Sequence, residues 1–180
     1  IFHTKSERIW RWINRFCDFT PYNHKVTGLV CGKLVPIPFN FQSIEKCFPK
    51  AISERLISKL IEAFGFGSRV TIFELINHDD DDLSFLGDFV YKNVFIGYSE
   101  KQWGTDANNI NPSVLKRVPV AISYDDRYFD DKFQGIPTNG YTGLIKNIAT
   151  HSKIKIVQAH VSYSDFKNSD GVVINTSPVD

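Results

Sequence analysis

A ten-residue stretch in the middle of the chain gathers side chains that suit the binding of a flat ring or a sugar. It contains three aromatic rings, one hydroxyl and one amide, on Phe95, Tyr98, Trp103, Ser99 and Gln102. Aromatic faces stack on nucleobases and on pyranose rings, while a hydroxyl and an amide satisfy their polar edges. The alternative is that the same rings close a helical core, and residue type alone leaves both interpretations open.

Two neighbouring segments supply charge. Lys116-Arg117 lies between prolines, and the planar guanidinium of Arg117 suits a bidentate grip on a phosphate, although a lone arginine is often only solvated. Farther on, Asp125 and Asp126 precede Arg127. Paired carboxylates can perform acid-base chemistry or brace an arginine, and we favour bracing here.

The metal-binding and thiol residues form no recognisable site. The five histidines are scattered without ligand spacing, at His3, His24, His78, His151 and His160. The three cysteines, an odd number without C-x-x-C spacing, are expected to be buried thiols rather than a disulfide framework or zinc site. The aspartate run 79–82 lacks the spacing of a calcium loop, and we expect a solvated connection that also starts the next helix.

The composition is that of a globular protein able to bury a core. The 180 residues are 42% hydrophobic and 23% charged, with a net charge of +1. This balance provides no field to hold a nucleic acid, so any phosphate must be gripped locally. No apolar run approaches the roughly 18 to 20 residues of a membrane span, and we expect a cytoplasmic protein.

The hydrophobic pattern predicts a mixed α and β chain. Helices are expected at about 6–17, at several points between 43 and 93, and from Gly140 onward. Strands are expected at 26–30 and 34–37 around a Cys31-Gly32-Lys33 turn, and at 154–157 and 172–174, with the prolines of 34–37 confining that run to an edge or loop. No G-x-G-x-x-G, G-x-S-x-G, H-E-x-x-H or P-loop is present.

Several short motifs follow one another along the chain, and their order is characteristic. They are Ile1-Phe2-His3-Thr4, Pro21-Tyr22 before His24, Gly97-Tyr98 with Lys101-Gln102-Trp103-Gly104, Ser113 to Pro119, Asp125 to Phe129, and Phe133 to Pro137 with Gly140-Tyr141-Thr142. Together they resemble the middle of a bacterial UDP-galactopyranose mutase, over essentially the whole chain. The resemblance implies an isomerase that interconverts UDP-galactopyranose and UDP-galactofuranose through a reduced-flavin N5-sugar adduct, for cell-surface polysaccharide. It makes FAD the cofactor, and the protein's part is positioning and electrostatics.

The resemblance also assigns roles to residues. Arg117 matches a mobile-loop arginine that closes on the diphosphate, and it is the catalytic candidate. Substrate-binding candidates are Phe95 and Tyr98 (uridine), Ser99, Trp103 (sugar and lid), Tyr128 (diphosphate) and His24 (cleft). His3 matches a histidine that faces the isoalloxazine. Ser99 replaces a usual threonine and keeps the hydroxyl, while Val94 replaces a frequent second aromatic and weakens the uridine platform.

The resemblance implies a fold of the α/β (mixed α+β) class, excised from a Rossmann-like FAD/NAD(P)-binding flavoprotein. The fragment would consist of a small helical-bundle substrate domain and part of an antiparallel or mixed β-sheet domain. We expect four parts: a sheet and cleft segment with the first helix and hairpin (1–40), the helical bundle (41–96), a mobile substrate-binding loop with a sheet segment (97–140), and a helix with strands leading back to the FAD domain (141–180). Without the N-terminal glycine-rich unit and the C-terminal segment, this fragment is expected to bind no FAD and to be inactive alone.

Two alternatives remain for the function. One is a non-catalytic UDP-sugar-binding module, and the other is a different FAD-linked, amine-oxidase-like oxidoreductase. The second would not explain Lys101-Gln102-Trp103-Gly104 together with Asp125 to Phe129. The expected partners are UDP-galactose and UDP-galactofuranose, with a homodimer left open and no nucleic acid.

Overall fold

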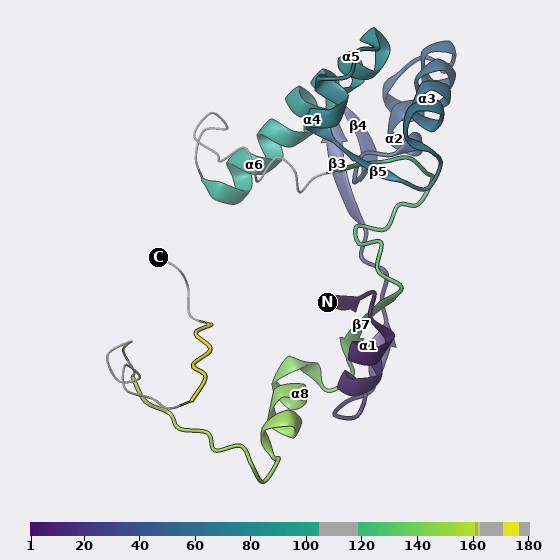
Figure 1. Cartoon of the computed structure of the whole chain (residues 1–180). Helices are drawn as coiled ribbons and strands as arrows, with labels where there is room; N and C mark the ends of the chain where they lie inside the picture. Colours follow the sequence, from purple (N-terminus) through teal and green to yellow (C-terminus); the bar gives the residue numbers. More distant parts are fainter. Residues whose placement is uncertain (105–118, 161, 163–170, 177–180) are drawn as a thin grey trace.

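The computed structural model describes residues 1–104, 119–160, 162 and 171–176, which form two groups of elements joined by two chain segments (Figure 1). Helices gather around the β3–β4 hairpin in one group, and a three-stranded sheet lies with α1 and α8 in the other. The segments 21–26 and 122–133 run between the groups. The mixed helix and strand content confirms the coarse fold class, while the four-part division stays a prediction.

The helices of the first group begin at residues that cap their free N–H groups. Asn40 accepts from Ser43 N, and Asp80 accepts from the N–H groups of the next helix. Thr71 and Glu74 form a reciprocal capping box. The helices are α2 (Phe41–Cys47), α3 (Lys50–Phe64), α4 (Ile72–Ile76), α5 (Asp81–Val90), the π-helix η1 (Tyr91–Phe95) and α6 (Ile96–Trp103). Asp80 therefore confirms that the aspartate run starts a helix.

The core of this group lies where α2, α3 and α5 meet β4. Leu56, Leu60 and Leu86 are fully buried there, and Val35 of β4 and Ile122 belong to the same buried cluster. Because α3 places Leu56 and Leu60 one turn apart, one face of the helix is apolar while the other meets solvent. This core fixes η1 and α6, which carry the aromatic segment 95–104.

A two-stranded hairpin confirms the strands predicted at 26–30 and 34–37. β3 (Val26–Val30) pairs antiparallel with β4 (Lys33–Ile37), with Gly28 opposite Val35. At the turn, Cys31 and Gly32 both have positive φ, 48° and 75°. β4 pairs only with β3 among the described strands, so it is an edge strand. Proline is tolerated in such a strand, which accounts for Pro36. A second pair, β5 (Arg69–Thr71) with β6 (Pro119–Ala121), was not predicted.

The second group is a sheet in the order β1-β7-β2, from Phe2–Thr4, Phe133–Pro137 and Phe19–Pro21. Trp10 of α1 (Glu7–Ile13) stacks on Phe133 at 5.5 Å and tilts against Phe19 at 5.0 Å. Gly135 permits this packing, since a Cβ there would meet Thr20 O at 3.0 Å. The predicted helix 6–17 starts correctly at the Ser6 cap but ends four residues early, where Asn14 donates its side-chain amide to Trp10 O.

Three expectations are wrong. Residues 154–157 and 172–174 form no strands, and no described segment pairs with them. Val172 is 92% exposed and Ile156 is 72% exposed, and an unpaired strand leaves its hydrogen-bonding groups without partners. Cys31 is exposed at the hairpin turn rather than buried, while Cys17 and Cys47 are half-buried.

None of the described helices, α8 (Gly140–Ala149) included, has the length and apolar character needed to cross a membrane.

Candidate functional site

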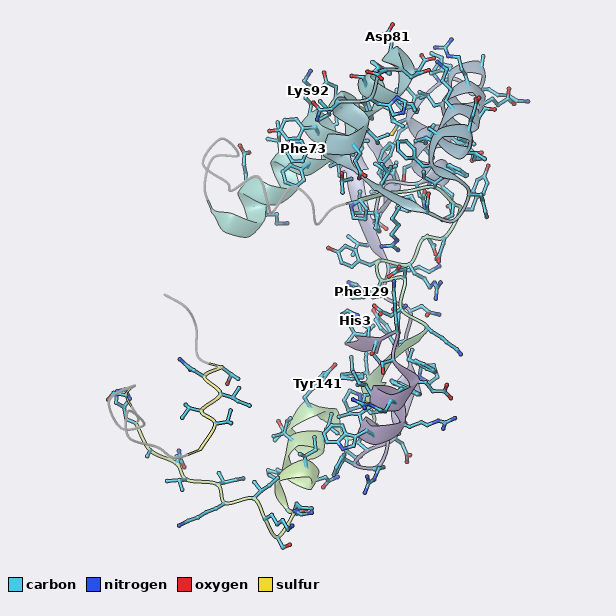
Figure 2. All side chains as sticks on the ribbon, viewed as in Figure 1. His3, Phe73, Asp81, Lys92, Phe129 and Tyr141 are labelled. Atoms are coloured by element: carbon cyan, nitrogen blue, oxygen red, sulfur yellow. The ribbon has the colours of Figure 1, made fainter. Side chains whose placement is uncertain are left out.

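Three of the predicted site residues meet around one phenylalanine between the two groups. The ring of His3 stacks on Phe129 with centroids 3.7 Å apart and planes 16° apart. His24 stacks on the same ring at 6.0 Å, and Tyr128 meets His24 edge to face at 5.6 Å. Figure 2 shows His3 and Phe129 side by side where the two groups join. The structure therefore brings His3, His24 and Tyr128 together. We call these three residues and Phe129 the histidine-tyrosine cluster.

Backbone pairing between distant segments positions this cluster. Tyr128 N donates to His24 O at 2.8 Å, and Lys25 forms an isolated antiparallel bridge with Arg127. The guanidinium of Arg69 also donates to the carbonyl of Tyr128 at 3.3 Å. The chain before β3 and the chain after β6 are thus held together where they cross between the two groups. The side chains of these two segments therefore meet, although neither segment forms a helix or a strand there.

Carboxylates surround the cluster and are paired with cations. Asp125 accepts from Arg127 Nε at 3.0 Å and from Nη2 at 2.7 Å, so the expected bracing is confirmed for this residue. Asp126 instead pairs with Lys25 at 2.7 Å, and Asp130 pairs with Lys5 at the same distance. Hydrogen bonds from Arg127 lower the pKa of Asp125, as the hydrogen bond from Lys5 lowers the pKa of Asp130. Asp125 and Asp130 are consequently ionised partners of cations rather than proton donors near neutral pH.

The Asp125–Arg127 pair predicts a pH dependence of stability. A carboxyl whose folded pKa is lowered stabilises the fold above its unfolded pKa of about 3.9, and this contribution is lost as the pH falls through the folded value. Because both side chains are about a third exposed, we expect Asp125→Asn to lower the free energy of unfolding by about 1 kcal/mol or less at about pH 7. The difference should shrink progressively below about pH 4. Urea denaturation across this pH range measures it.

Asp79→Asn is the control for this pair. Asp79 is exposed and makes no ion pair with the described residues. The control should therefore change stability by a few tenths of a kcal/mol at most. If the wild-type and Asp125→Asn proteins differ equally at all pH values, the ion pair does not explain the loss.

A hollow of about 680 Å³ lies beside the cluster, between the β3–β4 hairpin and the helices η1 and α6. Tyr128 forms part of its wall, and Val94, Gly97 and Lys101 line it at helical spacing from η1 and α6. The rest of the lining comes from Val26, Thr27, Gly28, Leu29, Val30, Ile37 and Asn93. An apolar hollow with a few polar groups at its edge is typical of a small-molecule site.

The remaining predicted residues divide into two sets. Phe95 is fully buried and stacks on Tyr91 at 5.8 Å, so it packs the core beneath the hollow, and its contact with a substrate stays a prediction. Tyr98, Ser99 and Trp103 belong to α6, but their side chains lie outside the described structure, as does the whole of Arg117. Their roles also stay predictions.

Sequence reasoning missed two residues of this site. Asp131 lies 2.7 Å from His3 Nδ1, and the buried Gln134 donates its amide to the carbonyls of Phe129 and Asp131 at 3.0 and 2.9 Å. Gln134 lies within the quoted Phe133 to Pro137 motif and Asp131 lies just after the Asp125 to Phe129 motif, but neither residue was given a role. Their partners are distant in the chain or are main-chain carbonyls, which spacing alone does not show.

Comparison with known proteins relates the chain to one family. Residues 93–180 match the model of the family described as UDP-galactopyranose mutase. A probable UDP-galactopyranose mutase of Klebsiella pneumoniae is 38% identical over 156 residues, which is 87% of this chain. This chain is a relative of the UDP-galactopyranose mutases. The family match over residues 93–180 includes Tyr128 and Phe129 of the histidine-tyrosine cluster, and Val94, Gly97 and Lys101 of the hollow.

Two other relatives show the breadth of the similarity. A UDP-galactopyranose mutase of Mycoplasma genitalium is 33% identical over 87% of this chain, and a dTDP-fucopyranose mutase of Escherichia coli is 39% identical over 86%. The chain spans about 40% of the length of the mutases from Klebsiella and Escherichia. The mutase relationship thus concerns one part of longer proteins.

Proposed function

We propose that this chain forms the nucleotide-sugar-binding part of a flavin-dependent mutase that interconverts UDP-galactopyranose and UDP-galactofuranose. One observation carries the proposal: Tyr128 belongs both to the wall of the hollow and to the cluster with His24 and His3. A nucleoside in the hollow would place its diphosphate near the Tyr128 hydroxyl. The sugar would then lie toward the two histidines.

The described residues suit a flavin in part. His3 and Phe129 form a flat stack, and the His3 side chain is 36% exposed, so one imidazole edge is available to a planar ring. No strand of the chain is followed by a G-x-G-x-x-G turn that would hold the dinucleotide phosphates. Reduced FAD, when bound, supplies the nucleophile for the sugar. In our proposal that cofactor is held mainly by other parts of the intact, cytoplasmic isomerase.

The residues of this chain bind and orient the substrate. Lys101 at the hollow, together with Arg117, would offset the negative charge of the diphosphate, and Tyr128 would donate a hydrogen bond to it. Holding the diphosphate fixes the sugar relative to the cofactor and keeps the nucleotide close while the ring rearranges. The intact protein would thereby supply galactofuranose for cell-surface polysaccharide.

A dTDP-sugar is the second candidate substrate. The Escherichia coli dTDP-fucopyranose mutase is as similar to this chain as the Klebsiella protein, at 39% against 38% identity. Val94 lines the hollow where many UDP-galactopyranose mutases are expected to carry an aromatic ring, and the smaller side chain leaves more room beside a base. Thymine differs from uracil by one methyl group, which makes this position relevant to the choice.

Titration of tryptophan fluorescence with UDP tests the proposal. We expect saturable quenching with a Kd between about 1 μM and 1 mM, and no response to phosphate alone. Tyr128→Phe should weaken binding about tenfold to 100-fold, because one hydrogen bond to a charged group is lost. A parallel titration with dTDP decides between the two substrate classes.

Tyr124→Phe is the matched control. Tyr124 donates to Glu45 at 2.6 Å and does not line the hollow, so this variant should bind UDP as the wild type does. Equal weakening in the two variants would contradict the placement of the diphosphate at Tyr128. Absence of any response to UDP and dTDP would contradict the nucleotide site in this chain.

A further inference from the structure

A short contact joins the His3 imidazole of the histidine-tyrosine cluster to a carboxylate just before β7. His3 Nδ1 and Asp131 Oδ2 are 2.7 Å apart, although 128 positions separate them in the chain. The Asp131 side chain is 15% exposed, and that of His3 is 36% exposed. The carboxylate is therefore largely shielded from water, while one edge of the imidazole stays open.

Both partners are held in place by independent contacts. Pairing of β1 with β7 sets His3 opposite Gln134. The buried Gln134 side chain then donates to the carbonyls on either side of the turn, Phe129 O and Asp131 O. The face of the His3 ring is fixed by its stack on Phe129. The His3 ring therefore cannot rotate away without breaking its stack, and the hydrogen bond from Gln134 holds the main chain that carries the Asp131 carboxylate.

The contact also decides which ring nitrogen carries the proton in neutral His3. An ionised carboxylate only accepts hydrogen bonds, so Nδ1 must carry a hydrogen and donate it. The opposite nitrogen, Nε2, is then an acceptor, and no described residue bonds to it. We infer that Asp131 is a positioning residue that holds His3 as the Nδ1–H tautomer and turns Nε2 outward as a hydrogen-bond acceptor.

This inference rests on the proposed function. It specifies that the ligand group facing His3 Nε2 is a hydrogen-bond donor. An acceptor nitrogen pairs with a donor, which is a sugar hydroxyl or a ring N–H of a bound cofactor, and it repels a phosphate oxygen. His3 thus favours a ligand group that donates a hydrogen bond over an anionic one. The second member of a histidine-carboxylate pair commonly fixes the tautomer in this way.

Nitrogen-15 NMR of the histidine rings tests the inference on the chain itself, without ligand. At a pH at which the ring signals report a neutral His3, we expect a protonated Nδ1 and an unprotonated Nε2. Asp131→Ala should move the ring toward the Nε2–H form that free histidine favours in water. Asp131→Asn keeps an accepting oxygen and should retain the Nδ1–H tautomer.

Asp130→Asn is the control, because it removes the neighbouring carboxylate that pairs with Lys5 and leaves the His3 contact intact. Its His3 signals should match those of the wild type. An Nε2–H tautomer in the wild type overturns the inference without any variant, and so does an unchanged tautomer in folded Asp131→Ala. Failure of UDP to bind would contradict the proposed function but would leave the ring signals, and hence this test, unaffected.

Discussion

Gly87→Ala is expected to destabilise the helical group by about 3 kcal/mol, although alanine is the better helix former by about 1 kcal/mol. Gly87 lies within α5 where that helix crosses α4. A Cβ at this position would be 2.6 Å from Ile76 N and 2.8 Å from Leu75 Cβ. Since the first of these atoms is backbone, the two helices would have to separate, and the core beneath them would loosen. Urea denaturation followed by circular dichroism measures the loss.

Gly97→Ala is the matched substitution in the next helix. Gly97 lies in α6, and a Cβ there would meet none of the described atoms within 4 Å. Removing the flexibility of glycine should therefore stabilise the chain by about 0.5 to 1 kcal/mol. Opposite signs for the two variants would confirm the close approach at Gly87. A stabilising Gly87→Ala would show that α4 and α5 are not in contact as described.

Local chemistry made the helical group predictable from the sequence. Asp80 caps α5 as the aspartate run suggested, and apolar residues such as Leu56 and Leu60 recur at the spacing of one helix face. Caps and periodicity act within one or two turns, so they are visible in a short window of residues. The hairpin was predictable for the same reason, because β3 and β4 are joined by a two-residue turn with glycine.

Long-range pairing explains what the sequence did not reveal. β7 pairs with β1 and β2, which are more than 110 positions earlier, and each of those strands has three residues. Such strands are too short to show an alternating pattern. Conversely, Val172 to Ile174 has strand-forming residues but no described partner, and β propensity expresses packing against neighbours rather than a local preference.

The site shows the same division. His24 and Tyr128 were chosen through a resemblance, and the structure brings them together with 5.6 Å between ring centroids. Phe129 belonged to a quoted motif, but its place between the two histidines follows from tertiary structure alone. Phe95 illustrates the opposite difficulty, since an aromatic residue beside a binding segment can serve the core, as its complete burial shows.

Arg117→Ala is expected to lower kcat/KM for UDP-galactopyranose about 100-fold in the intact mutase to which we assign this chain. The expectation rests on the resemblance, which places Arg117 on the diphosphate, and on the strength of a charge-assisted, bidentate contact with phosphate oxygens. A contact of this kind contributes about 1.5 to 3 kcal/mol, and each 1.4 kcal/mol is a factor of ten. Steady-state kinetics with the purified variant measures the effect.

Two further variants separate the guanidinium from simple charge. Arg117→Lys keeps the positive charge but loses the planar fork, so it should recover only part of the activity. Lys116→Ala removes one positive charge at the preceding residue and should change kcat/KM less than threefold, because loss of a solvated surface charge costs about 0.5 kcal/mol or less. Near-normal kcat/KM in Arg117→Ala would exclude the diphosphate role of this residue. Equal losses in Arg117→Ala and Lys116→Ala would instead assign the effect to the positive charge of the segment as a whole, since only a specific phosphate contact distinguishes two adjacent cations.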